Sequence, residues 1–186
     1  MSIYTRIAPV AVGATLSVAV LATGIAMAGN VHLKPPNRNP TFQDLGLALR
    51  ANGNLAGLGN GDVVIFLTAQ ADVTSTCTNP AGATQPPGQN PAPITVAGSQ
   101  AIPADEIKNG NVSFSVLTQA PSPTIAGAPD CPNPNWTEAI EDLAFTSATI
   151  RVEQPAENVV LTVSCTFTPP TSNGVVPSSN VSCTSS

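Results

Sequence analysis

Apolar and polar residues alternate along the segment from Val63 to Cys77. The apolar positions are Val63, Ile65, Leu67, Ala69, Ala71, Val73 and Cys77, and the polar positions are Thr68, Gln70, Asp72, Thr74 and Thr76. Side chains of a strand point alternately to its two faces. The pattern therefore predicts a strand with one face in the core and one hydroxyl-rich face in water.

A second alternation, nearer the carboxyl end, predicts a β-hairpin. Its apolar positions are Val159, Leu161, Val163, Cys165 and Phe167, and the apolar phase before it contains Ala144, Ala148, Ile150 and Val152. The turn-forming residues of 153–158 lie between the two runs, so we expect 145–153 and 158–168 to pair as antiparallel strands. Further strands are expected at Leu45, Leu47 and Leu49, at Val112, Phe114 and Val116, and over 94–97 and 180–184.

One helical pattern competes with the strands near Asn135. Asn135 and Glu138 have the spacing of a helix capping box, and Trp136, Ile140 and Leu143 fall on one helical face. We therefore expect one or two turns of helix there.

The arrangement of strands and turns indicates the fold class. The Gly- and Asn-rich segment 51–62 is interpreted as a turn region that encloses at most a short strand around Leu55. Short strands separated by Pro, Gly and Asn turns, with at most one short helix, predict an all-β fold. We expect a single-domain antiparallel β-sandwich of immunoglobulin-like or Greek-key type.

Residues 1–28 have the pattern of a cleaved secretory signal peptide. Arg6 lies in a short polar start, the apolar run 7–26 follows, and Ala26-Met27-Ala28 is a small-residue cleavage site. An uncleaved membrane anchor is the alternative, because the run approaches the roughly 20 residues of a spanning helix. No second run of that length follows, so we expect a protein that is secreted and extracellular, or located in a periplasm or at the cell surface.

Proline-rich segments suggest how the exported chain is divided. Residues 29–41 are predicted to form an extended Pro-rich N-terminal arm, and 42–186 the sandwich domain with a Pro-rich loop at 78–93. Proline fixes the backbone and removes amide donors, so the arm and the loop are both expected to lie outside the sheets.

The charge of the chain excludes two classes of partner. Residues 29–186 hold five basic and eleven acidic side chains, a net charge of −6. Nucleic acids and anionic membranes both require clustered Lys and Arg. We therefore expect no nucleic-acid partner and no anionic lipid partner. Because no second apolar run is long enough, we also expect no membrane span after signal cleavage.

The four cysteines are expected to form two structural disulfides in an exported chain. We favour Cys77 with Cys131 and Cys165 with Cys183, while pairing Cys77 with Cys165 across the two sheets is the alternative. A zinc site is not expected, because no Cys-x-x-Cys spacing occurs and no histidine lies near a cysteine.

Acidic residues are the main candidates for chemistry. Glu138, Glu141 and Asp142 cluster in the sequence, and with Asp130 they could supply hard oxygen ligands to a weakly bound Ca²⁺. A hydrolase that used acidic residues alone would draw on the same cluster. The simpler interpretation is a solvated acidic edge, with no catalytic residue, no resident metal and no other cofactor.

Trp136 is the only tryptophan, and it is a candidate either for ligand contact or for capping one end of the core. The triplets that begin at Asn111, Asn135 and Asn180 match the N-glycan acceptor pattern.

Other catalytic arrangements are poorly represented in the sequence. His32 is the only histidine and lies in the arm, where a rigid nucleophile and base arrangement is not expected. Gly53, Gly57, Gly59 and Gly61 are interpreted as turn residues, because the Lys and Ser/Thr of a phosphate loop are missing.

The leading hypothesis is a secreted, non-catalytic β-sandwich that acts as a structural or binding module. Its partner would be an extracellular protein or glycan. Alternatively the chain would associate with itself, because the arm carries Lys34 and Arg38 while most of the remaining chain is acidic. The alternative from another class is a small secreted hydrolase that uses acidic residues only, or an inhibitor of a hydrolase.

Overall fold

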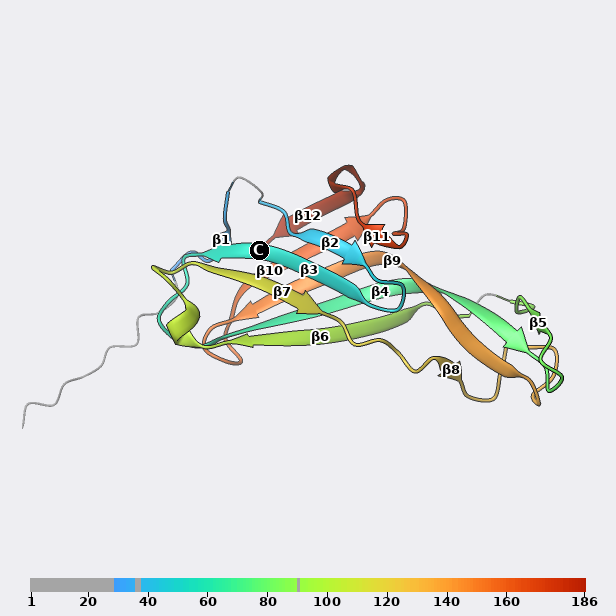
Figure 1. Cartoon of the computed structure of the whole chain (residues 1–186). Coiled ribbons are helices and arrows are strands. Elements are labelled where there is room, and N and C mark those ends of the chain that lie inside the picture. Colours follow the sequence, from blue (N-terminus) through green and yellow to red (C-terminus); the bar gives the residue numbers. More distant parts are fainter. Residues whose placement is uncertain (1–28, 36–37, 90) are drawn as a thin grey trace, which may run out of the picture.

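The computed structural model describes residues 29–35, 38–89 and 91–186, so the predicted signal peptide lies outside the described residues. Two antiparallel sheets pack on one another (Figure 1), and the prediction of an all-β sandwich is confirmed. In the described ranges the only helical elements are the 3₁₀ turns η1 (Ala104–Glu106) and η2 (Ser178–Asn180).

The smaller sheet, called sheet A, has five strands. They are β1 (His32–Leu33), β2 (Thr41–Asp44), β3 (Leu49–Ala56), β7 (Val112–Leu117) and β11 (Gly174–Val175). Strand β3 is central: β7 pairs along one edge, while β2 and β1 pair one after the other along the opposite edge. Strand β11 extends the sheet beyond β2.

The larger sheet, called sheet B, has seven strands. They are β4 (Val63–Thr78), β5 (Thr84–Gln85), β6 (Ile94–Ile102), β8 (Thr124–Ile125), β9 (Thr137–Glu153), β10 (Val159–Phe167) and β12 (Val181–Ser185). Strands β9 and β10 form the predicted hairpin, and β4 lies between β9 and β6. The alternation seen in the sequence sets the two faces: Leu67 is buried and Thr68 is exposed.

The hydrophobic core lies between the two sheets. Phe42 of sheet A and Phe167 of sheet B meet edge to face, with ring centroids 4.9 Å apart. The sheets also converge where β6 passes β7, because Gln119 N donates to Ala97 O. Any side chain at Gly98 would overlap the carbonyl oxygen of Leu117, so glycine is required at this approach.

Strands β4 and β9 continue past the sandwich as a narrow ribbon (Figure 1). We call residues 72–78 of β4 and 137–144 of β9, together with β5 and β8, the distal extension. Strand β6 pairs with β4 only as far as Ala71, and β10 pairs with β9 from Ser147 onward. The distal extension therefore lacks the neighbouring strands that the body has.

The predicted helix near Asn135 is wrong. Residues from Thr137 onward form β9, and Thr137–Ala139 pair with Thr76–Thr78 of β4. Strand pairing and the burial of Glu138 and Ile140 on one face outweigh the local capping pattern.

The predicted strand at Leu45, Leu47 and Leu49 is wrong at its first two positions, because Leu45 and Leu47 lie in the turn between β2 and β3, while Leu49 is the first residue of β3. Gly46 has a φ of 83°, and Leu45 N donates to Ala48 O. The left-handed backbone at Gly46 breaks the alternation that the leucines suggested. The strand around Leu55 is longer than expected: β3 runs from Leu49 to Ala56, so the first half of segment 51–62 is strand and only 57–62 form the turn.

Two segments expected outside the sheets contribute short strands. In the arm, His32 and Leu33 pair with Ala56 and Leu55, and the apolar side chains of Val31 and Leu33 are buried. In the Pro-rich loop, β5 pairs with the end of β4. Burial of two apolar side chains explains why the arm joins the sheet despite its prolines.

Both disulfides are present, joining Cys77 to Cys131 and Cys165 to Cys183. The alternative pairing of Cys77 with Cys165 does not occur. Cys77–Cys131 ties a loop to the distal extension, while Cys165–Cys183 joins adjacent residues of β10 and β12. No described helix has the length and apolar character needed to cross a membrane.

Candidate functional site

Glu138 is fully buried in the distal extension, opposite Cys77 in the β4–β9 pairing. Its Oε1 accepts a hydrogen bond from Ser75 Oγ at 2.9 Å, and its Oε2 accepts one from the backbone N–H of Asp130 at 3.3 Å. Both carboxylate oxygens are therefore used by the fold, as buried polar groups require. Glu138 anchors the loop that carries Cys131.

Glu141 and Asp142 point to different surroundings. Glu141 is the extra residue of a β-bulge, is exposed, and accepts a hydrogen bond from Thr76 Oγ1 at 2.7 Å. Asp142 lies near the Gly46 turn: a Cβ on Gly46 would be 3.6 Å from Asp142 Oδ1 and 3.3 Å from Asn173 Oδ1. Asp142 Oδ1 is buried and has no hydrogen-bond partner in the described ranges.

The four carboxylates that the sequence suggested for Ca²⁺ are therefore not brought together. Asp130 contributes its backbone N–H to the Glu138 carboxylate, and Glu141 and Asp142 lie apart at the bulge and the turn. Within the described part of the chain, no group of three His, Cys, Asp or Glu residues is arranged to hold a metal ion.

Asp44 is a buried carboxylate that the sequence analysis did not single out. It accepts hydrogen bonds from Gly46 N at 2.9 Å and from Thr171 Oγ1 at 2.5 Å. Burial raises the pKa of Asp44, these two hydrogen bonds lower it, and the nearby Asp142 charge raises it, with a net increase. A single Asp at a strand end gives no sequence signal of this environment.

Trp136 is half-buried in the loop between Cys131 and β9, where its backbone N–H donates to Asn133 O. Of the glycan acceptor asparagines, Asn135 is exposed in the same loop, while Asn180 ends η2. The amide of Asn111 donates to the carbonyl of Asn109 at 2.8 Å.

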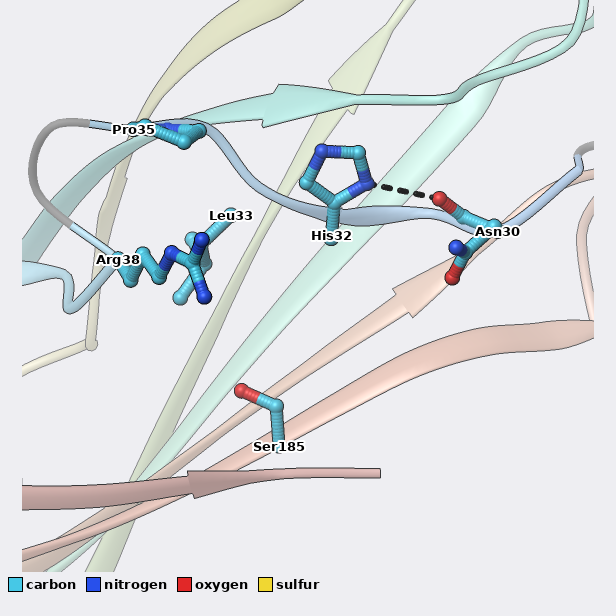
Figure 2. A pocket seen from close by; sticks show the side chains of 6 residues that line it. All are labelled: Asn30, His32, Leu33, Pro35, Arg38 and Ser185. Carbon is cyan, nitrogen blue, oxygen red and sulfur yellow. Dashed lines mark hydrogen bonds between the residues drawn. The ribbon is translucent and has the colours of Figure 1, made fainter.

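The arm forms one wall of a groove of about 360 Å³ (Figure 2). Asn30, His32, Leu33, Pro35 and Arg38 line it from the arm, and Ser185 lines it from β12. His32 Nδ1 lies 2.8 Å from the carbonyl oxygen of Asn30. Pairing of β1 with β3 positions the imidazole, so His32 belongs to an ordered sheet edge rather than to a mobile tail.

Two further grooves, of about 300 and 260 Å³, lie on the outward face of sheet A. They share Asn54 and Ser113, which are register partners joined by a 2.6 Å hydrogen bond from Ser113 Oγ to Asn54 Oδ1. The larger groove also contains Asn39, Thr41 and Asn52. The smaller one also contains Lys34, Glu106, Lys108 and Asn111.

The five cations of residues 29–186 are unevenly distributed. Arg151 on sheet B pairs with Glu153 at 3.1 Å and lies over the ring of Phe66. The other four cations belong to the arm, to β3 or to the loop before β7; they are Lys34, Arg38, Arg50 and Lys108. In the described ranges none of these four is within ion-pair distance of a carboxylate, because Arg151–Glu153 is the only pair found.

The grooved face of sheet A was missed by sequence reasoning. The sequence does contain an alternation that indicates a polar outward face. Its polar positions are Arg50, Asn52 and Asn54, and its apolar positions are Leu49, Ala51 and Leu55. It was hidden because the glycines and asparagines of 51–62 were interpreted as a turn.

Comparison with protein-family models, with curated proteins and with solved structures found no significant match.

Proposed function

We propose that this chain is an exported, non-catalytic β-sandwich that acts outside the cytoplasm as a structural or binding module, with its ligand contact on sheet A. Export is supported by the signal-like residues 1–28 and by the use of all four cysteines in disulfides.

The main support for the proposal is where the candidate acidic residues lie and which hydrogen bonds they accept. A glycosidase needs two carboxyl groups held about 5–10 Å apart across a cleft. Here both oxygens of Glu138 accept hydrogen bonds from the fold, while Glu141 sits on an exposed bulge. The described grooves of sheet A are lined mainly by amides, hydroxyls and cations, and Glu106 is the single carboxylate among their lining residues, so neither groove holds a carboxyl pair.

The test compares turnover with binding in the secreted protein. The wild type and the Glu141→Gln and Asp142→Asn variants are incubated with glycan and peptide panels, and both product release and retention on glycan arrays are measured. We expect no product, and the same glycan retention for all three proteins. Turnover that disappears in either variant, with an unchanged melting temperature, would establish a hydrolase instead.

The inhibitor alternative needs a separate measurement. The same wild-type protein is added to a panel of secreted glycosidases and proteases, and their residual activity is measured. We expect unchanged activity, because binding through sheet A requires no enzyme partner. Stoichiometric inhibition of one of these enzymes would contradict the proposed role.

A further inference from the structure

The outward face of sheet A carries a row of small polar side chains at strand spacing. We call Thr41, Asn52, Asn54, Ser113 and Ser115 the amide face. Asn52 pairs with Thr41 on one side and with Ser115 on the other, and Asn54 pairs with Ser113. Amide and hydroxyl groups can both donate and accept hydrogen bonds, so this row matches a ligand rich in hydroxyl groups.

Cations flank the amide face at both ends. Lys34 and Lys108 line the groove that contains Asn54. Arg50 shares the outward phase of β3 with Asn52 and Asn54, and its Nη1 donates to Gln43 Oε1 at 3.3 Å. Positions 50 to 54 of a strand span about 13 Å, which a short oligosaccharide covers and a single sugar ring does not.

The charge of these cations is not neutralised by ion pairs within the described ranges. Glu106 borders the same groove as Lys34 and Lys108, but it forms no ion pair with either. In a chain whose residues 29–186 carry a net charge of −6, unpaired cations gathered on one face create a local field that attracts anions. Ammonium groups that meet a carboxylate ligand form charge-assisted hydrogen bonds, which are stronger than neutral ones.

Aromatic stacking contributes little to this surface. Phe114 lines the larger groove but is 3% exposed, and its ring packs beneath Gly53. Recognition here must therefore come from hydrogen bonds and charge, so affinity should fall as salt increases. The field of the cations selects for an anionic ligand over a neutral one of the same shape.

We propose that the amide face binds an acidic oligosaccharide, whose hydroxyl groups meet Asn52, Asn54 and Ser113 and whose carboxylates meet Lys34 and Lys108. This inference rests on the proposed binding role and specifies its ligand class. An acidic surface of a second copy of the chain is a different occupant, and the test below separates the two.

The test uses tetragalacturonate and its fully methyl-esterified form, titrated calorimetrically into the secreted protein. The two probes differ in charge but share the sugar chain. We expect the acid to bind at least about tenfold more tightly than the ester, and to weaken as NaCl rises from about 50 to about 500 mM. The double variant Lys34→Gln/Lys108→Gln should lose about tenfold or more in affinity for the acid.

Matched variants localise the effect. Arg151→Gln removes a cation from sheet B and should change affinity for the acid by less than about twofold. Asn54→Asp retains the acceptor for Ser113 Oγ while placing a negative charge in the amide face, so it should abolish binding of the acid. Glu106→Gln should tighten binding by about twofold, because it removes a repulsive charge.

The possible results separate this inference from the proposed function. If the acid and the ester bound with equal affinity, and Asn54→Asp left that affinity unchanged, the chain would still bind glycans. The inferred selection for charge would be overturned. No binding of either probe at millimolar concentration, or an equal loss in Arg151→Gln, would overturn the inference. So would a concentration-dependent mass increase in light scattering that Lys34→Gln/Lys108→Gln removes, which would assign the face to self-association.

Discussion

In the body of the sandwich, apolar side chains from two sheets meet between the layers, with Phe42 packed edge to face on Phe167. In the distal extension, the buried positions include Glu138 and Ser75, and Cys77 is bonded to Cys131. The body can therefore rely on apolar burial. The extension buries fewer apolar side chains, namely Val73, Ile140 and Leu143, and it adds a disulfide and a hydrogen-bonded carboxylate. Beside its two long strands lie the short β5 and β8.

This difference separates the region that carries the proposed binding surface from the distal extension. The grooves of sheet A lie on the body, where the layered core fixes β3 and β7 and hence the side chains they present. Rigid elements position a ligand-contacting surface better than loops do. The extension can then open without disturbing the amide face, which makes the two regions separable by mutation.

The largest effect is expected from Phe42→Ala in the body. Removing a buried aromatic ring that contacts both sheets should lower the free energy of unfolding by about 3–5 kcal/mol, from lost burial and the cavity left behind. The control Thr68→Ala, on the exposed face of sheet B, should change it by less than about 0.5 kcal/mol. Urea titration measures both, and a loss below about 1 kcal/mol for Phe42→Ala would mean that the layers are not held by this contact.

The next effect is expected from Cys77→Ser/Cys131→Ser in the extension. In the chain-entropy model, this disulfide, with a sequence separation of 54, contributes up to about 4 kcal/mol. That loss lowers the free energy of global unfolding, because the closed loop includes β6 and β7 of the body. We expect an additional local effect: hydrogen exchange should accelerate more at 73–77 and 137–143 than at 63–69.

A uniform change in hydrogen exchange would contradict the distinction between the body and the distal extension. If exchange accelerated equally in the body and the extension, the two would form one cooperative unit. The double variant Cys165→Ser/Cys183→Ser provides the contrast, because it removes a bond between adjacent strands at the edge of the body. It should leave protection in the distal extension unchanged.

Much of the fold could be predicted from residue patterns that reflect burial. The Val63–Cys77 alternation and the β9–β10 hairpin were predicted because each strand has one buried and one wet face. The strand at Thr137–Ile140 was not, because Glu138 is buried through partners at Ser75 and Asp130 that the local sequence does not reveal.

The grooved surface was harder to predict than the fold. Asn54 and Ser113 are 59 residues apart and become partners only through the pairing of β3 with β7. The arm joins this surface through Val31 and Leu33, whose apolar character was outweighed by the neighbouring prolines in the sequence interpretation. Long-range pairing creates the surface, so local sequence patterns did not single out its residues.

The smallest effect lies where the body meets the extension, at the Gly46 turn. Gly46 O accepts a hydrogen bond from Leu143 N, and Asp44 and Asp142 both approach the turn. Burial, aided by the Asp142 charge, raises the pKa of Asp44 above its usual value. A carboxyl with a raised folded-state pKa binds its proton more tightly when folded, so its contribution to stability is complete below pH 3.8 and is lost as pH rises through the folded pKa.

Asp44→Asn removes this titration and so tests the junction. The free energy of unfolding of the variant minus that of the wild type should become more positive as pH rises from about 4 to 7, because only the wild type pays the penalty of a buried charge. Urea titrations at several pH values measure this difference. The contributions of the other carboxylates to the pH dependence are the same in both proteins and cancel. Asp142→Asn should reduce the pH slope without abolishing it, since burial is the larger cause and remains. A difference that falls as pH rises would show that the hydrogen bonds from Gly46 and Thr171 outweigh burial, and that the junction holds Asp44 as a stabilised anion.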